Sequence, residues 1–572
     1  MDCDVLIIGA GPTGFMLAIE LTRANISCVL IDAKKGVSDI IKATAISSRA
    51  LEAFDDLDGA KPFVNKANFT HALNIYIEGQ PKLHLPWVGI ESKYPSFCLL
   101  GQNYVEKFQE DLLNSYGNKV HWNTSLIDFQ QNDDDITGTL EKNGKKLSFT
   151  CRYLIGCDGS NSTVREIAQI PLYGKTYPNH YLIADVRISG DFSRKDWYFF
   201  LSQQGFCSIG GLPDERWGVL ISLPKGKESE TKEMIDLAKV QSLFDEHSSI
   251  PGKLSDPRWI SHFHTHMKYV KNRQQGRIFL CGDAAHQISP LTSLGMNSGL
   301  LDAKNLAWKL ALVCQGIAQQ KILATYDQEQ RQTIKTAQRL SDANERSFAM
   351  TGVLSREVRD HFTELFLRLP PVMRMFGGIM SQINIAFKKS VLIDEFIGLP
   401  LLNFLSSKRH LSSEKNCLNA WMDFSRGPKP GSYSIDIENI YCPKLRHQKW
   451  LFDNTLKGKH ALLLFMGITV PDEQHWASLK EIADFTNNHY SKWINIYFII
   501  ADEQWPEHFD CPYSVFFDKD KEAHQRYGAT VDCLYLIRPD RFVAYRSLPP
   551  RLDMFIKYLT KVFSISSYQE NE

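Results

Sequence analysis

Uninterrupted apolar runs open the chain and predict strands that are buried on both faces. Val5 to Ile8 form one run, in a strand expected at 4–8, and Cys28 to Ile31 form a second, in a strand expected at 27–31 that ends at Asp32. Between them lie a glycine-rich turn, Gly9 to Gly14, and a segment from Phe15 to Asn25 with the pattern of a helix. Short apolar runs bounded by turn residues are typical of strands in a parallel sheet. The order of these segments predicts a βαβ unit at the N-terminus.

Farther along, the pattern divides the chain into regions of strands and regions of helices. Polar and apolar residues alternate over 118–155, with turn signals between, which predicts several strands. Residues 176–270 are rich in aromatic and β-branched residues and predict a largely antiparallel sheet that forms a separate layer. A further buried strand is expected at 277–281, and helices at 47–57, 103–116, 296–313 and 322–350.

The last third of the chain predicts a second α/β unit. Residues 354–405 have an apolar, helical pattern that prolines interrupt at 370–371 and at 400. The Pro/Gly-rich stretch from Arg426 to Gly431 is the expected linker. Beyond it, apolar runs predict strands at 461–465, 493–500 and 533–537, with helical segments between them.

Composition narrows the class of protein. A chain of 572 residues is long enough for more than one domain, and 43% hydrophobic residues exclude a disordered chain. Lys+Arg and Asp+Glu are both 65, so no net charge directs the protein towards nucleic acid or an anionic membrane. We expect no secretory signal, because its cleavage would remove the glycine motif that follows the first strand. We also expect no spanning helix, because no uninterrupted apolar run reaches about 18 residues. The twelve cysteines include no Cys-x-x-Cys and suit reduced thiols in a cytoplasmic protein.

The turn at residues 9–14 has the pattern Gly-x-Gly-x-x-Gly, which suits a dinucleotide. Glycine lets the backbone turn tightly and approach a pyrophosphate, and the following helix supplies free N–H groups and the positive end of its dipole. Asp32 lies eighteen residues after Gly14, where a carboxylate can accept bonds from ribose hydroxyls. This pattern fits FAD and NAD equally.

Two later segments combine a buried strand with small and polar residues. Asp158 and Gly159 follow the strand at 153–155 and precede a Ser/Asn-rich helix start. Asp283 ends the strand at 277–281, where its carboxylate can accept a bond from a polyol hydroxyl. Gly295 to Gly299 then open a long helix, whose first amides can face an electron-rich ring and stabilise negative charge.

In this order and at these separations, the three motifs resemble those of the class A flavoprotein monooxygenases, the p-hydroxybenzoate hydroxylase-like family. The resemblance extends to residue 345 and implies an α/β fold. Residues 1–175 and 275–345 would form a Rossmann-like, three-layer FAD-binding domain, and 176–274 a substrate-binding β-sheet domain. NADPH or NADH would be a co-substrate without its own dinucleotide domain, because Gly-x-Gly-x-x-Gly occurs once.

The resemblance also implies the cofactor contacts. Asp32 would bind the adenosine ribose, Asp283 the ribityl chain, and Asp158 both FAD and the pyridine nucleotide. Lys42 stands where relatives usually carry an arginine near the phosphates, and it lacks the planar fork of arginine. The expected FAD-binding residues are Gly9, Gly11, Pro12, Thr13, Gly14, Asp32, Lys42, Gln102, Leu126, Asp158, Asp283, Pro290, Gly295, Met296 and Asn297.

Two segments near the ends of these regions bear on the family pattern. Relatives usually have two further glycines beside the flavin, where this chain has Thr292-Ser293-Leu294-Gly295, so we expect a different loop shape and flavin mobility. Residues 531–546 resemble the end of the thioredoxin-like domain of phenol- and polyketide-hydroxylating members, with Arg541 in place of the usual glycine. This implies a helical segment and linker at 346–425 and a thioredoxin-like domain at 426–572. Without Cys-x-x-Cys, that domain would serve packing or homodimer formation.

Three other clusters leave alternatives open. His262, His264 and His266 alternate along a strand, and we interpret them as a polar face and not as a metal site, because no carboxylate or cysteine is nearby in sequence. The aromatic run from Trp197 to Phe200, with Phe206, can line a substrate cavity or fill a core. The catalytic residues are unknown from sequence, and the candidates for a base that ionises a phenol are Tyr198, His180 and Tyr181.

The resulting prediction is an FAD-dependent, NAD(P)H-consuming monooxygenase. Reduced FAD would react with dioxygen to give a flavin hydroperoxide, and one oxygen atom would pass to a phenolic or polycyclic aromatic substrate. The alternatives are a Baeyer–Villiger or antibiotic-modifying oxygenase, a flavin-dependent reductase, and a flavoprotein that has lost catalysis, since function lies in the site and not in the fold. A halogenase is disfavoured because no Trp-x-Trp-x-Ile-Pro pattern occurs.

Overall fold

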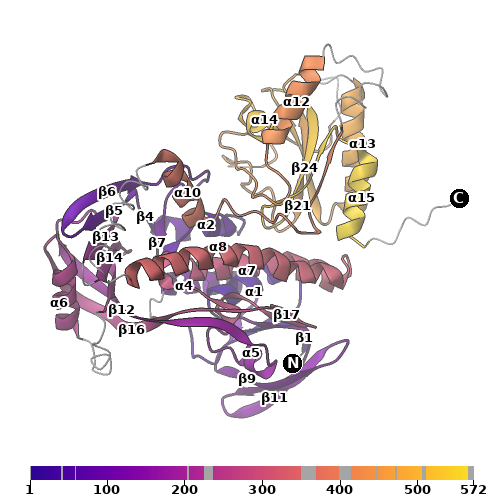
Figure 1. Ribbon diagram of the computed structural model, residues 1–572. Helices are drawn as coiled ribbons and strands as arrows, with labels where there is room; N and C mark the ends of the chain where they lie inside the picture. Colours follow the sequence, from indigo (N-terminus) through magenta and orange to yellow (C-terminus); the bar gives the residue numbers. More distant parts are fainter. Residues whose placement is uncertain are drawn as a thin grey trace.

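The computed structural model describes residues 2–349 and 369–564, apart from gaps at 40–42, 58–59, 203–204, 224–235, 399–413, 446–448, 470–472 and 506–510. Two long helices, α7 (Gly295–Cys314) and α8 (Ala324–Ala349), run through the middle of the molecule, and the C-terminal unit lies beside them (Figure 1). Within these ranges, no helix is both long and apolar enough to cross a bilayer.

The predicted βαβ unit forms at the N-terminus. β1 (Asp2–Ile8) pairs in parallel with β2 (Cys28–Ile31) and with β11 (Lys145–Gly156), and α1 (Pro12–Arg23) connects β1 to β2. The strand order is β17-β18-β11-β1-β2-β8, so β11 reaches its place beside β1 from far along the chain. The outer strands are β8 (Val120–His121), β17 (Gln274–Gln275) and β18 (Ile278–Leu280).

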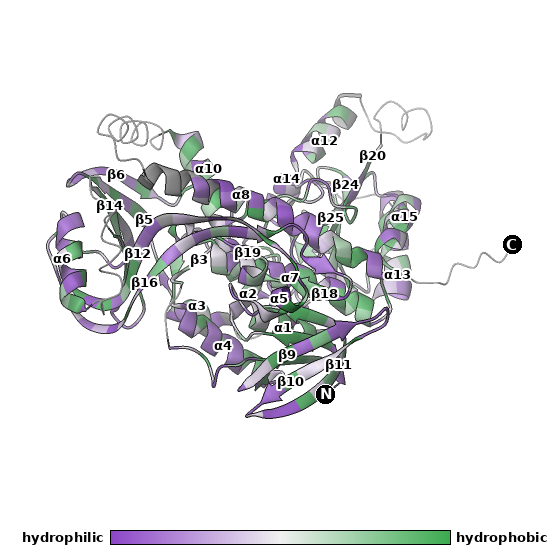
Figure 2. Ribbon diagram, turned by 60° about the horizontal axis from the view of Figure 1, so that its bottom comes forward, coloured by the Kyte–Doolittle hydropathy of each residue, from purple (hydrophilic) through white to green (hydrophobic). Residues whose placement is uncertain are grey.

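Successive residues of this sheet face two different cores, which produces three layers. Val5 and Ile7 pack with residues of α1, α7 and α4 (Gln102–Ser115), whereas Leu6 and Ile8 pack with residues of the strands that precede β11. These strands, β9 and β10, form an antiparallel meander with β11. Figure 2 shows the apolar centre around α1 and the more polar projecting ends of the meander. The expected three-layer α/β arrangement is confirmed. The meander strands are β9 (Thr124–Gln131) and β10 (Ile136–Lys142).

The second large sheet takes strands from two parts of the chain. Its order is β19-β16-β12-β15-β14-β13-β5-β6, and its pairs are antiparallel except for β13 with β5. The sheet therefore includes β5 and β6, which lie before the expected segment 176–274. The helix α6 (Leu237–His247) covers one face through Val240, Leu243 and Phe244. The strands are β5 (Ala72–Ile77), β6 (Gln80–Pro86), β12 (Leu172–Gly190), β13 (Asp196–Ser202), β14 (Gly205–Gly211), β15 (Trp217–Ser222), β16 (Gly252–Val270) and β19 (His286–Gln287).

Short elements join the two sheets. β3, β4 and β7 form a small antiparallel sheet in which β7 lies between the other two. The helix α2 caps its own N-terminus, because the Ser47 hydroxyl accepts a bond from the backbone N–H of Ala50 at 3.3 Å. The bounds are β3 (Ala45–Ile46), β4 (Asn68–Phe69), β7 (Cys98–Leu99), α2 (Ser48–Asp55), α3 (Ala60–Lys66) and α5 (Thr163–Ile167).

Of the stretch 354–405, the structure describes residues 369–398, and these are helical only in part. α10 (Pro370–Ser381) begins at the proline pair, as proline at the first helical turn permits. Residues 394–397 instead form β20 (Asp394–Ile397), which pairs in parallel with β25 (Val543–Leu548). The prediction of a helix there is wrong, because pairing with a strand about 150 residues away decides the conformation. The predicted break at Pro400 lies outside the described residues.

The C-terminal unit is built on a six-stranded sheet of order β20-β25-β24-β21-β22-β23. β21, β22 and β23 are parallel, while β24 is antiparallel to both β21 and β25. Because β20 and α12 precede residue 426, the unit begins before the expected linker. Its thioredoxin-like character and the division of the chain into four segments stay predictions. The bounds are α12 (Glu414–Arg426), β21 (His460–Met466), α13 (Glu473–Tyr490), β22 (Ile494–Ile500), β23 (Ser514–Phe517), α14 (Glu522–Tyr527), β24 (Asp532–Ile537) and α15 (Leu552–Val562).

Buried charges join the C-terminal unit to α7 and α8. The Glu329 carboxylate accepts bonds from Arg538 Nη1 and Nη2, at 2.7 and 2.8 Å, and from Lys309 Nζ at 2.8 Å. All three side chains are at most 1% exposed. Burial alone would raise the pKa of the Glu329 carboxyl, but Arg538 and Lys309 hold it well below its usual value. Arg538 also donates from Nε and Nη2 to Asp540, at 2.8 and 2.6 Å. Two cations therefore face two carboxylates inside the interface, and their charges balance.

Arg541, the residue in place of the usual glycine, belongs to the same interface. Its φ of +65° lies in the left-handed region that favours glycine. Its guanidinium donates to Glu52 at 2.8 Å and to Asp436 at 2.6 Å, and all three side chains are buried. The unfavourable backbone conformation is thus offset by two charged hydrogen bonds that link α2 to the C-terminal unit.

Replacing Glu329 should weaken the interface strongly. Glu329→Ala leaves Arg538 and Lys309 buried without their shared counter-charge, and we expect the free energy of unfolding to fall by about 3–5 kcal/mol. Urea denaturation followed by circular dichroism measures the change. Glu503→Ala is the matched control, because Glu503 pairs with Lys519 at the surface, and its midpoint should stay unchanged. Equal unfolding midpoints for the two variants would contradict the role of Glu329 as the counter-charge that stabilises this interface.

Candidate cofactor and substrate site

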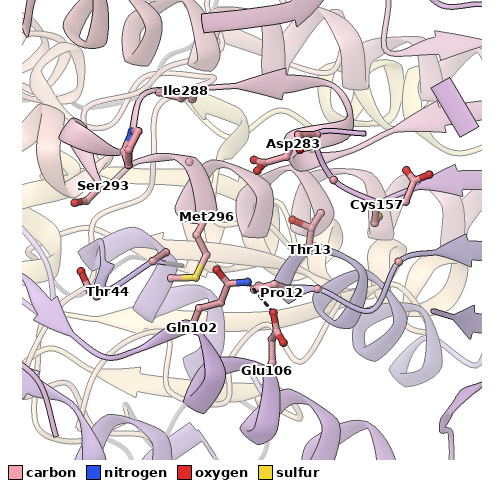
Figure 3. Close-up of a pocket in the computed structure, with 18 of the residues that line it drawn as sticks. Pro12, Thr13, Thr44, Gln102, Glu106, Cys157, Asp283, Ile288, Ser293 and Met296 are labelled. Carbon is pink, nitrogen blue, oxygen red and sulfur yellow. Dashed lines mark hydrogen bonds between the residues drawn. The ribbon is translucent and has the colours of Figure 1, made fainter. Parts of the chain in front are cut away.

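A large cavity lies between the two large sheets and the start of α7. Its volume is about 670 Å³, and residues from all three sequence motifs line it. Figure 3 shows Pro12, Thr13, Gln102, Asp283 and Met296 around this space. Of the expected FAD-binding residues, the lining contains Gly9, Gly11, Pro12, Thr13, Asp32, Gln102, Leu126, Asp158, Asp283, Pro290, Gly295 and Met296.

The glycines of the first motif have different tasks. Gly9 has a φ of +103°, and a Cβ there would lie 2.5 Å from the carbonyl oxygen of Cys157. A Cβ on Gly14 would lie 1.9 Å from the carbonyl oxygen of Gly9, so Gly14 allows α1 to pack against the strand end. Gly14 is not among the lining residues, and its expected contact with the pyrophosphate stays a prediction. A Cβ on Gly11 would meet no atom within 4 Å, so a ligand can approach the backbone there.

Asp32 is fixed at the end of β2 by the backbone. Its Oδ2 accepts a bond from the N–H of Ala10, and its Oδ1 accepts one from the N–H of Lys34, both at 2.8 Å. The residue is 9% exposed and lines the cavity. A carboxylate held in this way presents its remaining lone pairs in a fixed direction, as recognition of a ribose diol requires.

Asp158 has an oxygen atom without a partner. Its Oδ2 accepts a bond from the N–H of Val164 at 3.1 Å, but its Oδ1 is buried and meets no donor in the described part of the chain. Burial raises the pKa of the Asp158 carboxyl. A buried acceptor at the edge of a cavity suits a hydroxyl donor from a ligand.

Asp302 of α7 holds the loop that carries Asp283. One oxygen atom, Oδ2 of Asp302, accepts bonds from the N–H of Gly282 at 3.0 Å and from Arg273 Nη1 at 2.8 Å, and His286 Nε2 lies 2.7 Å away. Burial would raise the pKa of the Asp302 carboxyl, but Arg273 and His286 hold it below its usual value. Asp283 itself is open to the cavity. The loop is therefore anchored on the side away from the site.

The segment Thr292-Ser293-Leu294-Gly295, where relatives usually have further glycines, contributes some residues to the cavity lining and others to the core. Thr292 is 1% exposed, and its Oγ1 lies 3.2 Å from Ser341 Oγ of α8. Ser293 lines the cavity with a φ of +53°, a conformation that favours glycine. Asn297 does not line the cavity, because its side chain accepts a bond from Ser47 N at 3.0 Å and donates one to the Ser293 carbonyl at 2.7 Å. These hydrogen bonds hold the loop, and the expected contact of Asn297 with the flavin stays a prediction.

Glu106 lines the cavity although it is not among the residues predicted from the sequence. Gln102 Nε2 donates to Glu106 Oε1 at 2.7 Å, and both residues line the cavity (Figure 3). The only available signal was their spacing of four residues on one helix, which places both side chains on the same face. Lys42 lies outside the described residues, so its expected contact with the phosphates stays a prediction.

The second sheet supplies the other end of the cavity, lined by residues of β12 to β15. The strand period of two divides the aromatic run: Trp197 lines the cavity, whereas Tyr198 and Phe200 face the core under α6. The Tyr198 hydroxyl accepts a bond from the N–H of Ser193 at 2.8 Å. None of the three candidate bases, Tyr198, His180 and Tyr181, is among the lining residues, so the structure selects none of them.

The three alternating histidines lie on β16, away from this lining. The rings of His264 and His180 stand 4.0 Å apart on neighbouring strands. Across the parts of the chain that the structure describes, no group of three His, Cys, Asp or Glu residues could hold a metal ion.

Known proteins resemble this chain in sequence. It is 32% identical over 337 residues to pentachlorophenol 4-monooxygenase of Sphingobium chlorophenolicum, which covers 57% of this chain and 62% of the relative. It is 31% identical over 369 residues to a flavin-dependent monooxygenase of Mycobacteroides abscessus, which covers 60% of this chain and 75% of that protein. The chain thus spans about three fifths of the length of the pentachlorophenol enzyme.

The fold also resembles solved structures over nearly its whole length. Aklavinone-11 hydroxylase, solved as a ternary complex with FAD and aklavinone, superposes with a TM-score of 0.72 and covers 98% of this chain and 99% of its own. The two sequences are 18% identical, so this likeness shows the fold alone. The model of the family described as "FAD binding domain" matches residues 2–341, which include all three motifs. The chain belongs to this FAD-binding family.

Proposed function

We propose that the protein is an FAD-dependent monooxygenase that uses NAD(P)H and dioxygen to hydroxylate a phenolic or polycyclic aromatic ring. The observation that carries this proposal is the continuity of the cavity. The same space is lined by Gly11 and Asp32 at one end and by Trp197 and Leu220 at the other. A dinucleotide and an apolar ring can therefore meet within it. The names of the relatives, which are monooxygenases of aromatic compounds, support the same chemistry.

The residues of the cavity fit FAD. The open backbone at Gly11 and the start of α1 would hold the pyrophosphate, and Asp32 the adenosine ribose. The unpartnered Oδ1 of Asp158 and the carboxylate of Asp283 would accept bonds from hydroxyl groups. Met296 and Pro290 would line the flavin ring. These assignments follow from which groups line the cavity and from their hydrogen-bonding capacity.

The protein's own part in the reaction is positioning, exclusion of water and stabilisation of charge. FAD, when bound, accepts hydride from NAD(P)H and transfers one oxygen atom of dioxygen. The start of α7 has no side-chain cap at Leu294, so its first N–H groups are available where Gly295 lines the cavity. Free amides at a helix N-terminus stabilise negative charge. Leu99, Leu212 and Leu220 line the cavity and exclude water from the reacting ring.

Turnover tests the proposal directly. We expect the purified protein to be yellow and to oxidise NADPH or NADH faster when a phenol or a polyketide phenol is added. Product mass spectrometry should show the gain of one oxygen atom. Oxidation of NAD(P)H that continues equally without dioxygen, with a reduced organic product, would instead indicate a reductase.

Asp283 should be required for FAD retention. A charged hydrogen bond to a hydroxyl is worth about 1.5–3 kcal/mol, so Asp283→Ala should raise the FAD dissociation constant about tenfold or more. Titration of the apoprotein with FAD, followed by flavin fluorescence, measures the constant. Asp134→Ala, in the exposed turn between β9 and β10, is the matched control and should bind FAD like the unmodified protein. Unchanged affinity in Asp283→Ala would refute its role.

The altered loop should control the rate of flavin reduction. Thr292 packs against α8, and Ser293 places a side chain in the cavity at a left-handed φ. Replacing both by glycine removes these restraints. We expect Thr292→Gly with Ser293→Gly to change the rate of reduction by NAD(P)H more than the FAD affinity. Stopped-flow absorbance and FAD titration give the two values, and Ser293→Gly alone separates the cavity residue from the core residue. Identical reduction rates in all three proteins would leave the loop without a restraining role.

A further inference from the structure

Two glycines lie side by side on the β-sheet wall of the cavity. Gly210 of β14 pairs with Gly218 of β15, and Gly210 also pairs with Trp197 of β13. A Cβ on Gly210 would lie 2.6 Å from Leu99 Cδ1, and one on Gly218 would lie 3.4 Å from Thr44 Cγ2. Side chains would therefore fill the space between this wall and the Thr44 and Leu99 segments. Glycine within a strand marks a place where another group approaches the backbone closely, and at these two positions the groups are Leu99 and Thr44. The two glycines therefore let these segments pack against the sheet beside the cavity.

Ser208 is a polar side chain on the same strand as Gly210, and it also lines the cavity. Its Oγ accepts a hydrogen bond from Trp197 Nε1 at 2.8 Å. The direction of this bond is certain, because an indole N–H can only donate. The Ser208 hydroxyl therefore keeps its own hydrogen for another acceptor. Ser208 is 4% exposed and lines the cavity, so an acceptor atom of the ligand can receive that hydrogen.

The surroundings of Ser208 are apolar. Leu220 is its cross-strand neighbour on β15, and Ile183 is in turn the neighbour of Leu220 on β12. Paired residues of neighbouring strands point to the same face, and all three line the cavity. A hydrogen bond in an apolar setting discriminates strongly against ligands that leave its donor unpaired.

Charge in the cavity works against anionic ligands. Its described lining includes the carboxylates of Asp32, Glu106, Asp158 and Asp283 but, among Lys and Arg, only Lys34. The Lys34 ammonium lies 3.9 Å from Asp32 Oδ2 and is thus already close to a carboxylate. The pyrophosphate of a bound FAD would add further negative charge. A carboxylate on the substrate would be repelled and would find no cation among the described residues of this wall.

From these contacts we propose that the substrate is an uncharged arene whose oxygen atom accepts a hydrogen bond from Ser208, and that aromatic acids are poor ligands. The inference rests on the proposed function and specifies its substrate class. It assigns Ser208 as a positioning and specificity residue, with Trp197 orienting the serine hydroxyl.

Binding of two ligands that differ in a carboxylate tests, without turnover, whether the cavity disfavours aromatic acids. The FAD-loaded protein is titrated with 2-naphthol and with 6-hydroxy-2-naphthoic acid at pH 7, where the phenol is protonated and the carboxylate is charged. The change in the flavin absorption spectrum reports binding. We expect a dissociation constant at least tenfold lower for 2-naphthol, and a smaller difference at high salt, because salt screens the repulsion. Equal or tighter binding of the acid, or no binding of 2-naphthol, would overturn the inference.

Variants of Ser208 test the hydrogen bond. Ser208→Ala should raise the dissociation constant of 2-naphthol about tenfold, and Ser208→Thr should restore most of the affinity. Naphthalene has no oxygen atom, so its affinity should stay the same in Ser208→Ala. Equal losses for both ligands would show a purely structural role and contradict the assignment. Ser202→Ala is the control, because Ser202 lies on the neighbouring strand β13 at 2.7 Å from His247 Nδ1 and does not line the cavity.

The ligand titrations, taken together with the turnover assay, separate this inference from the proposed function. A protein that binds 2-naphthol through Ser208 but does not oxidise NAD(P)H faster in its presence would contradict the proposed function alone. A protein that hydroxylates aromatic acids preferentially would support the proposed function and overturn the inference.

Discussion

Close packing of glycines around Thr13 is the constraint on which the site depends. A Cβ on Gly282 or on Gly299 would lie 2.7 or 2.3 Å from Thr13 Oγ1, and a Cβ on Gly14 would touch the Gly9 carbonyl. The end of β1, the start of α1, the loop after β18 and the first turn of α7 therefore meet at one point. A larger side chain at any of these glycines would separate the segments. Because all three motifs meet there, this contact places their polar groups around one cavity.

The helix α7 extends this arrangement through the molecule. Its N-terminus lines the cavity, and Asp302, about two turns after Gly295, anchors the Asp283 loop. Asn305 and Lys309, on the following turns, donate to Glu329 in the cluster that holds the C-terminal unit. Buried charges of this kind are stable only when their partners are in place. The C-terminal unit and the Asp283 loop therefore both hold α7, each through buried charged groups of this helix. The C-terminal unit thus contributes to the site indirectly, through the position of α7.

The two ends of the cavity achieve recognition in different ways. At the end lined by Gly11 and Asp32, backbone amides and a carboxylate held by N–H groups are rigid parts of the parallel sheet. At the other end, the paired glycines and Ser208 belong to the antiparallel sheet, whose far face is covered by α6. The first set suits a cofactor shared by a family. The second set is an apolar wall with one oriented donor, the Ser208 hydroxyl.

The sequence by itself determined the βαβ unit, the three motifs and many of the residues that line the cavity, because strand period, turn glycines and carboxylates at strand ends are local signals. It also located the helix that begins at Gly295. Only the tertiary structure decided that β20 is a strand, that Gly14 and Asn297 pack away from the cavity, and that Ser208 lies beside paired glycines. Those features arise from contacts between segments distant in the chain, where pairing and packing outweigh local preference. A pattern along one strand shows which residues share a face, but the neighbouring strands decide what that face meets.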